Sequence, residues 1–185
     1  SDLDSPGQLL AYHGRAASDG KVRELRGECL VLDLDNTLWG GVIGDDGVDG
    51  IALGGSAFGE AYCHFQRYIL SLKQRGLILA VCSKNNPEAA ILPFKNHPEM
   101  VLKEEDIAVF VANWNDKASN IEYIAKVLNI GLDSLVFLDD SPFERNQVRT
   151  ALPMVAVPEL PEDVTDYAAA IEASGVLEAT TYSKD

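Results

Sequence analysis

Two aspartates spaced two residues apart are the positions best suited to chemistry in this chain. The segment CLVLDLDNTLW at 29–39 is an apolar run that ends in Asp33 and Asp35, with Thr37 two positions further on. Side chains along an extended segment alternate with a period of two, so both carboxylates point the same way. Paired carboxylates repel each other and are costly to desolvate, which indicates a cation site or a catalytic site. The competing interpretation is a helix cap followed by a solvated acid in a turn.

Polar residues also close or follow the other apolar runs. Ser83 closes the second run, Lys117 opens the helix expected after the third, and Asp139 and Asp140 follow the fourth. In parallel sheets the ligand site lies outside the carboxyl ends of the strands, so these residues can converge on one crevice. Each residue alone also fits a helix cap or a solvated helix face. Their occurrence together, each at a strand end, favours a shared site.

Such a site would contain the groups needed for phosphoryl transfer. A divalent cation held by carboxylates would neutralise the phosphate, and an aspartate could form an acyl phosphate. Ser83 and Lys117 could hold the phosphoryl oxygens. Mg²⁺ is the expected cation because it prefers a few carboxylates together with phosphate and water.

The elements that must position these residues alternate between strand and helix. Strands are expected at 28–34, 77–83, 107–111, 134–140 and 154–157. Helices are expected at 59–75, 87–95, 117–129, after Pro142, and at 162–173. Residues 39–56, rich in Gly and Asp, predict a small hairpin flap rather than a helix. This order predicts an α/β fold with three layers, Rossmann-like, around a mostly parallel sheet.

The length of the sequence suggests one domain, and its ends suggest a longer parent chain. The 185 residues predict a catalytic domain at 28–175, preceded by a linker or short helix at 1–27. Residues 176–185 are expected to be a C-terminal tail. Because the sequence begins without Met and stops at TTYSKD, we expect a domain excised from a longer chain, plausibly a multidomain synthase.

Composition excludes several classes of function. A net charge of −14 argues against binding to nucleic acids or anionic membranes, although a bound cation would still permit a phosphorylated substrate. Three cysteines, an odd number without ligand spacing, predict neither a disulfide framework nor a zinc site. No apolar run reaches membrane-spanning length, and the first residues do not resemble a signal peptide, so a cytoplasmic protein is expected.

The motifs together resemble the haloacid dehalogenase-like (HAD) hydrolases. The D-x-D-x-T motif of that superfamily matches Asp33, Asp35 and Thr37, and its serine, lysine and acidic-pair motifs match Ser83, Lys117 and the pair at 139–140. The resemblance implies that Asp33 is the nucleophile and Asp35 the general acid and base. It also implies that Asp33, Asp139 and the backbone of Asp35 bind Mg²⁺, with Asp140 supporting the metal. The span between Asp35 and Ser83 is too short for a large cap domain, so a minimal flap and an open site are expected.

Longer strings give a narrower resemblance. LDLDNTLWGGVIGDDG, AVCSKNN, FLDDSPFERN and LPMVAVPELP look like the FkbH-like branch of the superfamily, over residues 28–175. That resemblance implies transfer of a D-glyceryl unit from 1,3-bisphosphoglycerate to the phosphopantetheine thiol of an acyl carrier protein, with dephosphorylation. The product would be a starter or extender unit for polyketide biosynthesis. Ser141 departs from the Asn of the family pattern, which could alter substrate contacts.

The role of Cys82 separates two interpretations. The resemblance suggests a transient thioester on this thiol, and Lys84 could lower its pKa. Alternation along the strand would instead turn Cys82 away from Ser83 into the core, where free cysteines usually lie.

Residues near the crevice complete the expected site. Asn36, Thr37, Ser83, Lys84, Asn85 and Asp140 are predicted to bind substrate or phosphate, whereas Asp33, Asp35, Cys82 and Lys117 are predicted to be catalytic. Arg145 is expected either to bind a phosphate or to form a salt bridge on a helix surface. The alternatives to glyceryl transfer are a simple phosphatase acting on a small phosphomonoester and a catalytically silent docking module. The intact set of acidic, hydroxyl and lysine residues argues against the silent module.

Overall fold

The computed structural model describes residues 29–178, and its sheet is parallel and four-stranded. The strands are β1 (Cys29–Leu32), β2 (Ile78–Lys84), β3 (Val109–Asn113) and β4 (Leu135–Leu138). They lie in the order β3-β2-β1-β4, with every pairing parallel. All side chains of β1, β3 and β4 are buried, as expected for strands that are covered on both faces.

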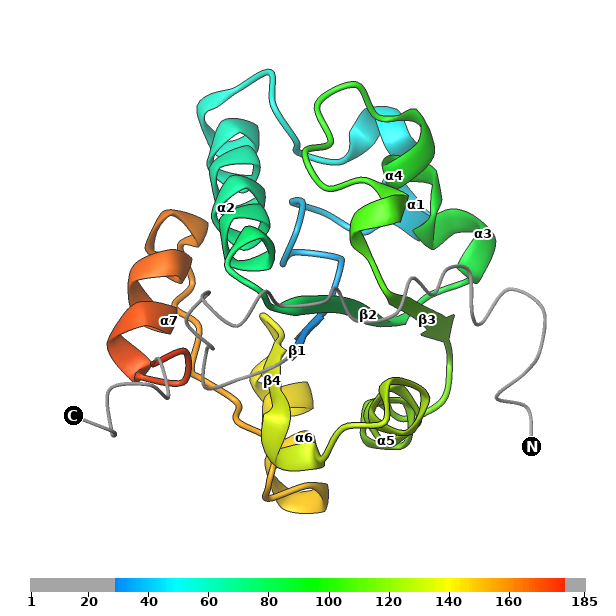
Figure 1. Cartoon of the computed structure of the whole chain (residues 1–185). Helices are drawn as coiled ribbons and strands as arrows, with labels where there is room; N and C mark the ends of the chain where they lie inside the picture. Colours follow the sequence, from blue (N-terminus) through cyan, green and yellow to red (C-terminus); the bar gives the residue numbers. More distant parts are fainter. Residues whose placement is uncertain (1–28, 179–185) are drawn as a thin grey trace.

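Helices cover both faces of this sheet (Figure 1). They are α1 (Ile43–Gly50), α2 (Ala57–Gln74), α3 (Pro87–Ala90), α4 (Leu92–Asn96), α5 (Lys117–Leu128), α6 (Pro142–Ala151) and α7 (Tyr167–Ser174). Helices α5 and α6 lie below the sheet in Figure 1, α1 to α4 lie above it, and α7 lies to its left, beside α2. Alternate residues of β1 enter two separate apolar clusters: Leu30 and Leu32 pack with α2 and α7, whereas Cys29 and Val31 pack with α5 and α6. The predicted three-layer, mostly parallel α/β fold is confirmed.

Most of the expected elements are present with shifted ends, but several predictions were wrong in detail. The helix expected at 87–95 is divided into α3 and α4, and the last helix begins as a 3₁₀ turn at Val164–Asp166. The strand expected at 154–157 is reduced to one parallel bridge between Val136 and Ala156. The linker predicted at 1–27 lies outside the described residues, as does most of the tail predicted at 176–185.

The flap is helical rather than a hairpin. A pair of backbone hydrogen bonds between Gly40 and Ala52 closes its base, at 2.8 and 3.0 Å, but α1 occupies the segment between them. Asp46 accepts a hydrogen bond from the backbone N–H of Val42 at 2.8 Å and stabilises the N-terminus of α1. Ile43 is buried, and Gly47, with φ of 70°, interrupts the helix. Capping and burial therefore outweigh the high glycine content of this segment.

None of the helices within residues 29–178 has both the length and the apolar composition required to cross a membrane.

Candidate active site

The carboxyl ends of β1 and β4 bring two aspartates together. Leu32 of β1 is in register with Leu138 of β4, and each is followed by an aspartate. The backbone N–H of Asp33 donates to the carbonyl of Leu138 at 3.0 Å, which keeps the two chains adjacent one residue beyond the sheet. Asp33 and Asp139 therefore lie side by side, and both are buried.

Lys117 lies between these two carboxylates. Its Nζ is 2.9 Å from Oδ1 of Asp33 and 2.5 Å from Oδ2 of Asp139, and its side chain is only 6% exposed. Asp116 caps α5 by accepting from the backbone N–H of Ser119, so the helix begins at Lys117 and directs it into the crevice. Burial tends to lower the pKa of Lys117, but the charges of Asp33 and Asp139 outweigh it and raise the pKa above its usual range.

Three carboxylates form a group suited to a cation. Asp33, Asp139 and Asp140 each offer one oxygen, and these oxygens all lie within 4.8 Å of one another. Thr37 Oγ1 is 3.0 Å from Oδ2 of Asp33 and 3.3 Å from Oδ1 of Asp140, so it links two of them. Burial, together with the charge of Asp33, raises the pKa of Asp139 to about 7 and that of Asp140 to about 8.

This donor set fits a hard divalent cation. Carboxylate oxygens are the ligands that Mg²⁺ prefers in proteins, and three carboxylates here face the single ammonium of Lys117. Asp140, which the sequence assigned both to phosphate binding and to support of the metal, is one of the three. Asp35 was predicted to bind the metal through its backbone, and its carboxylate lies outside this group.

The carboxylate of Asp35 faces the flap and β2 instead. Its Oδ1 accepts from Nε1 of Trp39 at 3.0 Å and from the backbone N–H of Ile43 at 2.9 Å. Its Oδ2 accepts from Nδ2 of Asn85 at 2.9 Å. The same Asn85 amide donates to Oγ of Ser83 at 2.9 Å, so the second aspartate of the D-x-D motif is connected to the hydroxyl at the end of β2.

Two further predicted binding residues are engaged with the protein. Asn36 adopts a left-handed conformation, with φ of 59°, and its Oδ1 accepts from the backbone N–H of Gly41 at 2.8 Å, which shapes the turn after the motif. Lys84 Nζ is 3.3 Å from Glu144, whose carboxylate is also 4.0 Å from Nζ of Lys117. Lys84 remains one-third exposed, so it can still contact a ligand from the solvent side.

The structure does not bring Cys82 into the crevice. Its side chain is fully buried in the apolar cluster below the sheet, and its Sγ is 3.9 Å from the backbone oxygen of Lys117. Burial raises the pKa of the thiol to about 12, despite the opposing effect of Lys117. The strand alternation that favoured the core is therefore the better guide, and a thioester on Cys82 has neither access nor a thiolate in this conformation.

Sequence reasoning did not identify Glu144, assigned no role to Trp39, and foresaw for Arg145 only phosphate binding or a surface salt bridge. Arg145 is only 3% exposed, and its Nη1 donates to the backbone oxygens of Asp139 and Asp140 at 3.0 and 2.9 Å. It therefore supports the loop of the carboxylate group rather than a helix surface, although it also pairs with Glu159 at 3.2 Å. The only available signal was its distance of five residues from Asp140, which places it one turn into α6.

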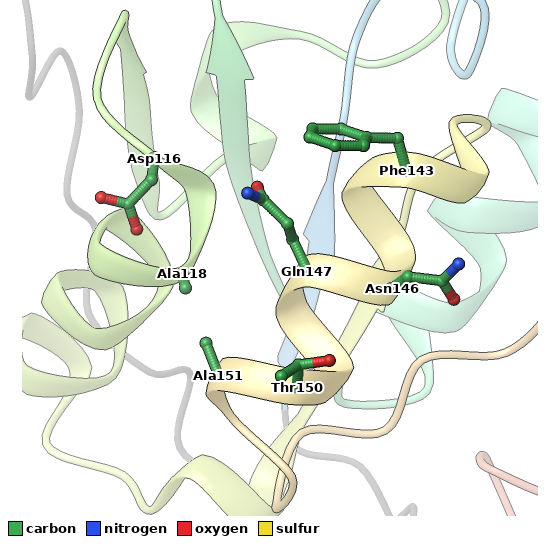
Figure 2. A pocket seen from close by; sticks show the side chains of 7 residues that line it. All are labelled: Asp116, Ala118, Phe143, Asn146, Gln147, Thr150 and Ala151. Carbon is green, nitrogen blue, oxygen red and sulfur yellow. The ribbon is translucent and has the colours of Figure 1, made fainter.

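A separate groove lies between α5 and α6 (Figure 2). Its volume is about 520 Å³, and it is lined by Asp116, Ala118, Phe143, Asn146, Gln147, Thr150 and Ala151. Asp116 adjoins Lys117 and Phe143 adjoins Glu144 in the chain, and Lys117 and Glu144 lie 4.0 Å apart beside the carboxylate group. None of the residues that the sequence assigned to the site lines it.

Comparison with solved structures gives the fold a family context. The chain is 57% identical, with a TM-score of 0.80, to the N-terminal part of protein BF1531 from Bacteroides fragilis, which contains a phosphatase domain complexed with Mg. The match covers 83% of this chain but 41% of that one, so the chain spans less than half of its relative. A HAD-like phosphatase from Mesorhizobium loti is 13% identical, with a TM-score of 0.58, over 95% of this chain and 98% of its own.

More distant structures agree in fold. The HAD domain of the effector Lem4 from Legionella pneumophila is 12% identical, with a TM-score of 0.53, over 80% of this chain and 92% of its own. No protein-family model matches the sequence, and no curated protein does. The chain therefore has the Rossmann-like α/β fold of HAD-like phosphatases and hydrolases, and its neighbours include a magnesium-bound phosphatase domain of 57% identity.

Proposed function

We propose that this domain is a magnesium-dependent phosphatase that hydrolyses phosphate esters through an aspartyl phosphate. The observation that carries the proposal is the group formed by Asp33, Asp139 and Asp140, within 4.8 Å of one another, with Lys117 bonded to two of them. A buried group with this excess of carboxylates needs a cation, and a cation beside a carboxylate and an ammonium is suited to a phosphate. The 57% identity to a phosphatase domain complexed with Mg supports the same proposal.

Each residue has a defined role in the proposed reaction. Asp33, Asp139 and Asp140 would hold Mg²⁺, which would supply positive charge to the phosphoryl oxygens. An oxygen of Asp33 attacks phosphorus, the bond from phosphorus to the leaving oxygen breaks, and Asp35 donates a proton to that oxygen. Asp35 then removes a proton from water, which attacks the aspartyl phosphate and releases inorganic phosphate. Lys117, which bonds to Asp33, and Ser83, which shares the Asn85 amide with Asp35, hold the transferred group.

The test is phosphate release from simple phosphomonoesters. Wild type should release phosphate from phenyl phosphate with Mg²⁺ and lose this activity in excess EDTA. Asp33→Asn should abolish release, because the amide cannot form the acyl phosphate, whereas Lys126→Ala, on the exposed side of α5, should retain it. A wild-type protein without activity on any phosphomonoester, or an active Asp33→Asn protein, would overturn the proposal.

We infer that a narrower function, glyceryl transfer from 1,3-bisphosphoglycerate to an acyl carrier protein, is the second candidate. Its support is the resemblance of the four sequence strings to the FkbH-like branch and the short flap, which leaves room for a macromolecular partner. The buried position of Cys82 favours direct attack by the carrier's phosphopantetheine thiolate on the acyl phosphate carbon, with inorganic phosphate as the leaving group. No enzyme thioester is needed in that version.

Intact-protein mass spectrometry separates the two functions. The domain is mixed with Mg²⁺, freshly generated 1,3-bisphosphoglycerate and a phosphopantetheine-loaded carrier protein. A glyceryl adduct on the carrier, formed equally well by a Cys82→Ala protein, would support transfer by the carrier's own thiol. Phosphate release with an unmodified carrier would leave the simple phosphatase as the function.

A further inference from the structure

The two oxygens of the Asp35 carboxylate have different surroundings. Oδ1 accepts two N–H groups, from the indole of Trp39 at 3.0 Å and from the backbone of Ile43 at 2.9 Å. Oδ2 accepts one, from Nδ2 of Asn85 at 2.9 Å, and it lies on the side of Ser83. A carboxylate oxygen has two lone pairs, so both sites of Oδ1 are occupied and one site of Oδ2 is free.

This asymmetry decides which oxygen can carry a proton. A protonated carboxyl group has one O–H donor, and the other oxygen is an acceptor. If Oδ1 carried the proton, it would meet two N–H donors and lose at least one hydrogen bond in a partly buried site. The acid form of Asp35 must therefore carry its proton on Oδ2, which faces Ser83 and the expected phosphate.

The position of Trp39 is determined by the core and the flap. Its side chain is fully buried and contacts Phe94 edge to face, with ring centroids 6.2 Å apart. The next residue, Gly40, is fixed by its two hydrogen bonds to Ala52 at the base of the flap. The indole N–H thus presents a rigid donor to Asp35, whereas a flexible side chain would lose entropy on making the same contact.

We propose that Trp39 is a positioning residue that, with the backbone N–H of Ile43, fixes the Asp35 carboxyl so that its proton lies on Oδ2. This inference rests on the proposed phosphatase function. Trp39 does not touch the substrate, and it acts through the general acid. It also makes the flap part of the catalytic machinery, because the two donors to Oδ1 lie at the start of that segment.

The test measures how the effect of Trp39→Phe depends on the leaving group. Phenylalanine retains an aromatic ring in the core but lacks the N–H. The probes are substituted phenyl phosphates, from 4-nitrophenyl phosphate, whose phenolate leaves without help, to phenyl phosphate, whose phenolate needs a proton. A general acid contributes about 10²–10⁴-fold, and kcat/KM reports the step in which the phenolate leaves, before water attacks the aspartyl phosphate. A misoriented Asp35 should therefore lower kcat/KM for phenyl phosphate about tenfold and for 4-nitrophenyl phosphate less than about twofold.

Two controls separate an effect on the orientation of Asp35 from a general loss of stability. Phe94→Leu disturbs the same aromatic contact without removing the N–H, so it should lower the melting temperature but leave the leaving-group dependence as in wild type. In an Asp35→Asn background, Trp39→Phe should change kcat/KM for phenyl phosphate by less than about twofold, because the acid on which it acts is already absent.

The outcomes distinguish this inference from the proposed function. An equal loss for all the phenyl phosphates, or the full additional loss in the Asp35→Asn background, would overturn the role of Trp39 while the phosphatase function stands. A wild-type protein that releases no phosphate from any probe with Mg²⁺ would overturn both. A loss that grows with the basicity of the leaving group and disappears without Asp35 supports the assignment.

Discussion

Replacing Lys117 by methionine tests whether the charges of the site are buried as the structure has them. The substitution retains the length of the side chain and removes the ammonium that lies 2.9 Å from Asp33 and 2.5 Å from Asp139. Because these carboxylates are only 8% and 1% exposed, water cannot replace the lost partner. Removing one partner of a buried ion pair costs about 3–5 kcal/mol of unfolding free energy.

That cost corresponds to a large thermal shift. For a domain of this size each kcal/mol lowers the melting temperature by about 2–4 °C, so Lys117→Met should lower it by about 6–20 °C in the absence of metal. Lys126→Met, on the exposed side of the same helix, should cost less than about 1 kcal/mol, because only its interaction with the helix C-terminus is lost.

The loss of unfolding free energy in Lys117→Met should also depend on pH and on metal. The folded-state pKa of Asp139 is raised to about 7, so this carboxyl is neutral in the folded protein at pH 5 and becomes charged as the pH rises. A group with a raised folded pKa loses its stabilising contribution as the pH rises through that value. In Lys117→Met the carboxylates that become charged at pH 9 have no ammonium partner. The loss of unfolding free energy should therefore be larger at pH 9 than at pH 5, and Mg²⁺ should restore part of it at pH 9.

Thermal and urea unfolding of both variants, with EDTA and with Mg²⁺, are the measurements. A metal-free loss below about 1 kcal/mol at pH 8 would refute the reasoning, because that is the cost typical of a solvated surface pair. A large loss that does not change between pH 5 and pH 9 would show that Lys117 stabilises the fold through packing rather than through charge.

Three further outcomes are expected. Mg²⁺ binding should strengthen from pH 6 to pH 9 and release protons near pH 7, because the raised pKa values of Asp139 and Asp140 leave protons for the cation to displace. Calorimetry in two buffers of different ionisation enthalpy measures the number of protons released. Binding without proton release would contradict the prediction. Cys82→Ala should keep phosphate release, and the native wild-type Cys82 should resist thiol reagents until the protein unfolds; rapid labelling of Cys82 in native protein would contradict its buried position. Arg145→Met should weaken Mg²⁺ binding and lower the free energy of unfolding by about 2–4 kcal/mol, because the backbone oxygens of Asp139 and Asp140, at 3.0 and 2.9 Å, lose a charged donor. An unchanged Mg²⁺ affinity in titration calorimetry would show that the loop of Asp139 and Asp140 does not need Arg145.

Local sequence patterns predicted much of the fold. Four apolar runs predicted the four strands, helical spacing predicted α2 and α5, and Pro142 predicted the start of α6. These predictions succeed because a strand covered on both faces needs a continuous apolar run, whereas a helix buried on one side repeats its apolar residues with its own period. The polar residues at the strand ends predicted which side chains would meet, because parallel strands end at the same edge of the sheet.

The flap shows where local patterns failed. Its glycines and aspartates predicted a hairpin, yet residues Ile43–Gly50 form α1. The N–H of Ile43 is satisfied by Asp35, eight residues earlier, and the side chain of Ile43 enters the core. Both stabilising contacts are made with residues outside the segment, so its own composition could not disclose them.

The sequence by itself determined the inventory of the site and the strands that carry it. The tertiary structure decided which atoms meet: Lys117 bonds to Asp33 and Asp139, Asp140 joins the carboxylate group, and Trp39 holds Asp35. It also decided that Cys82 is sealed in the core. Spacing along the chain fixes the direction of a side chain relative to its own strand, whereas distance and access to solvent depend on what the rest of the chain packs against it.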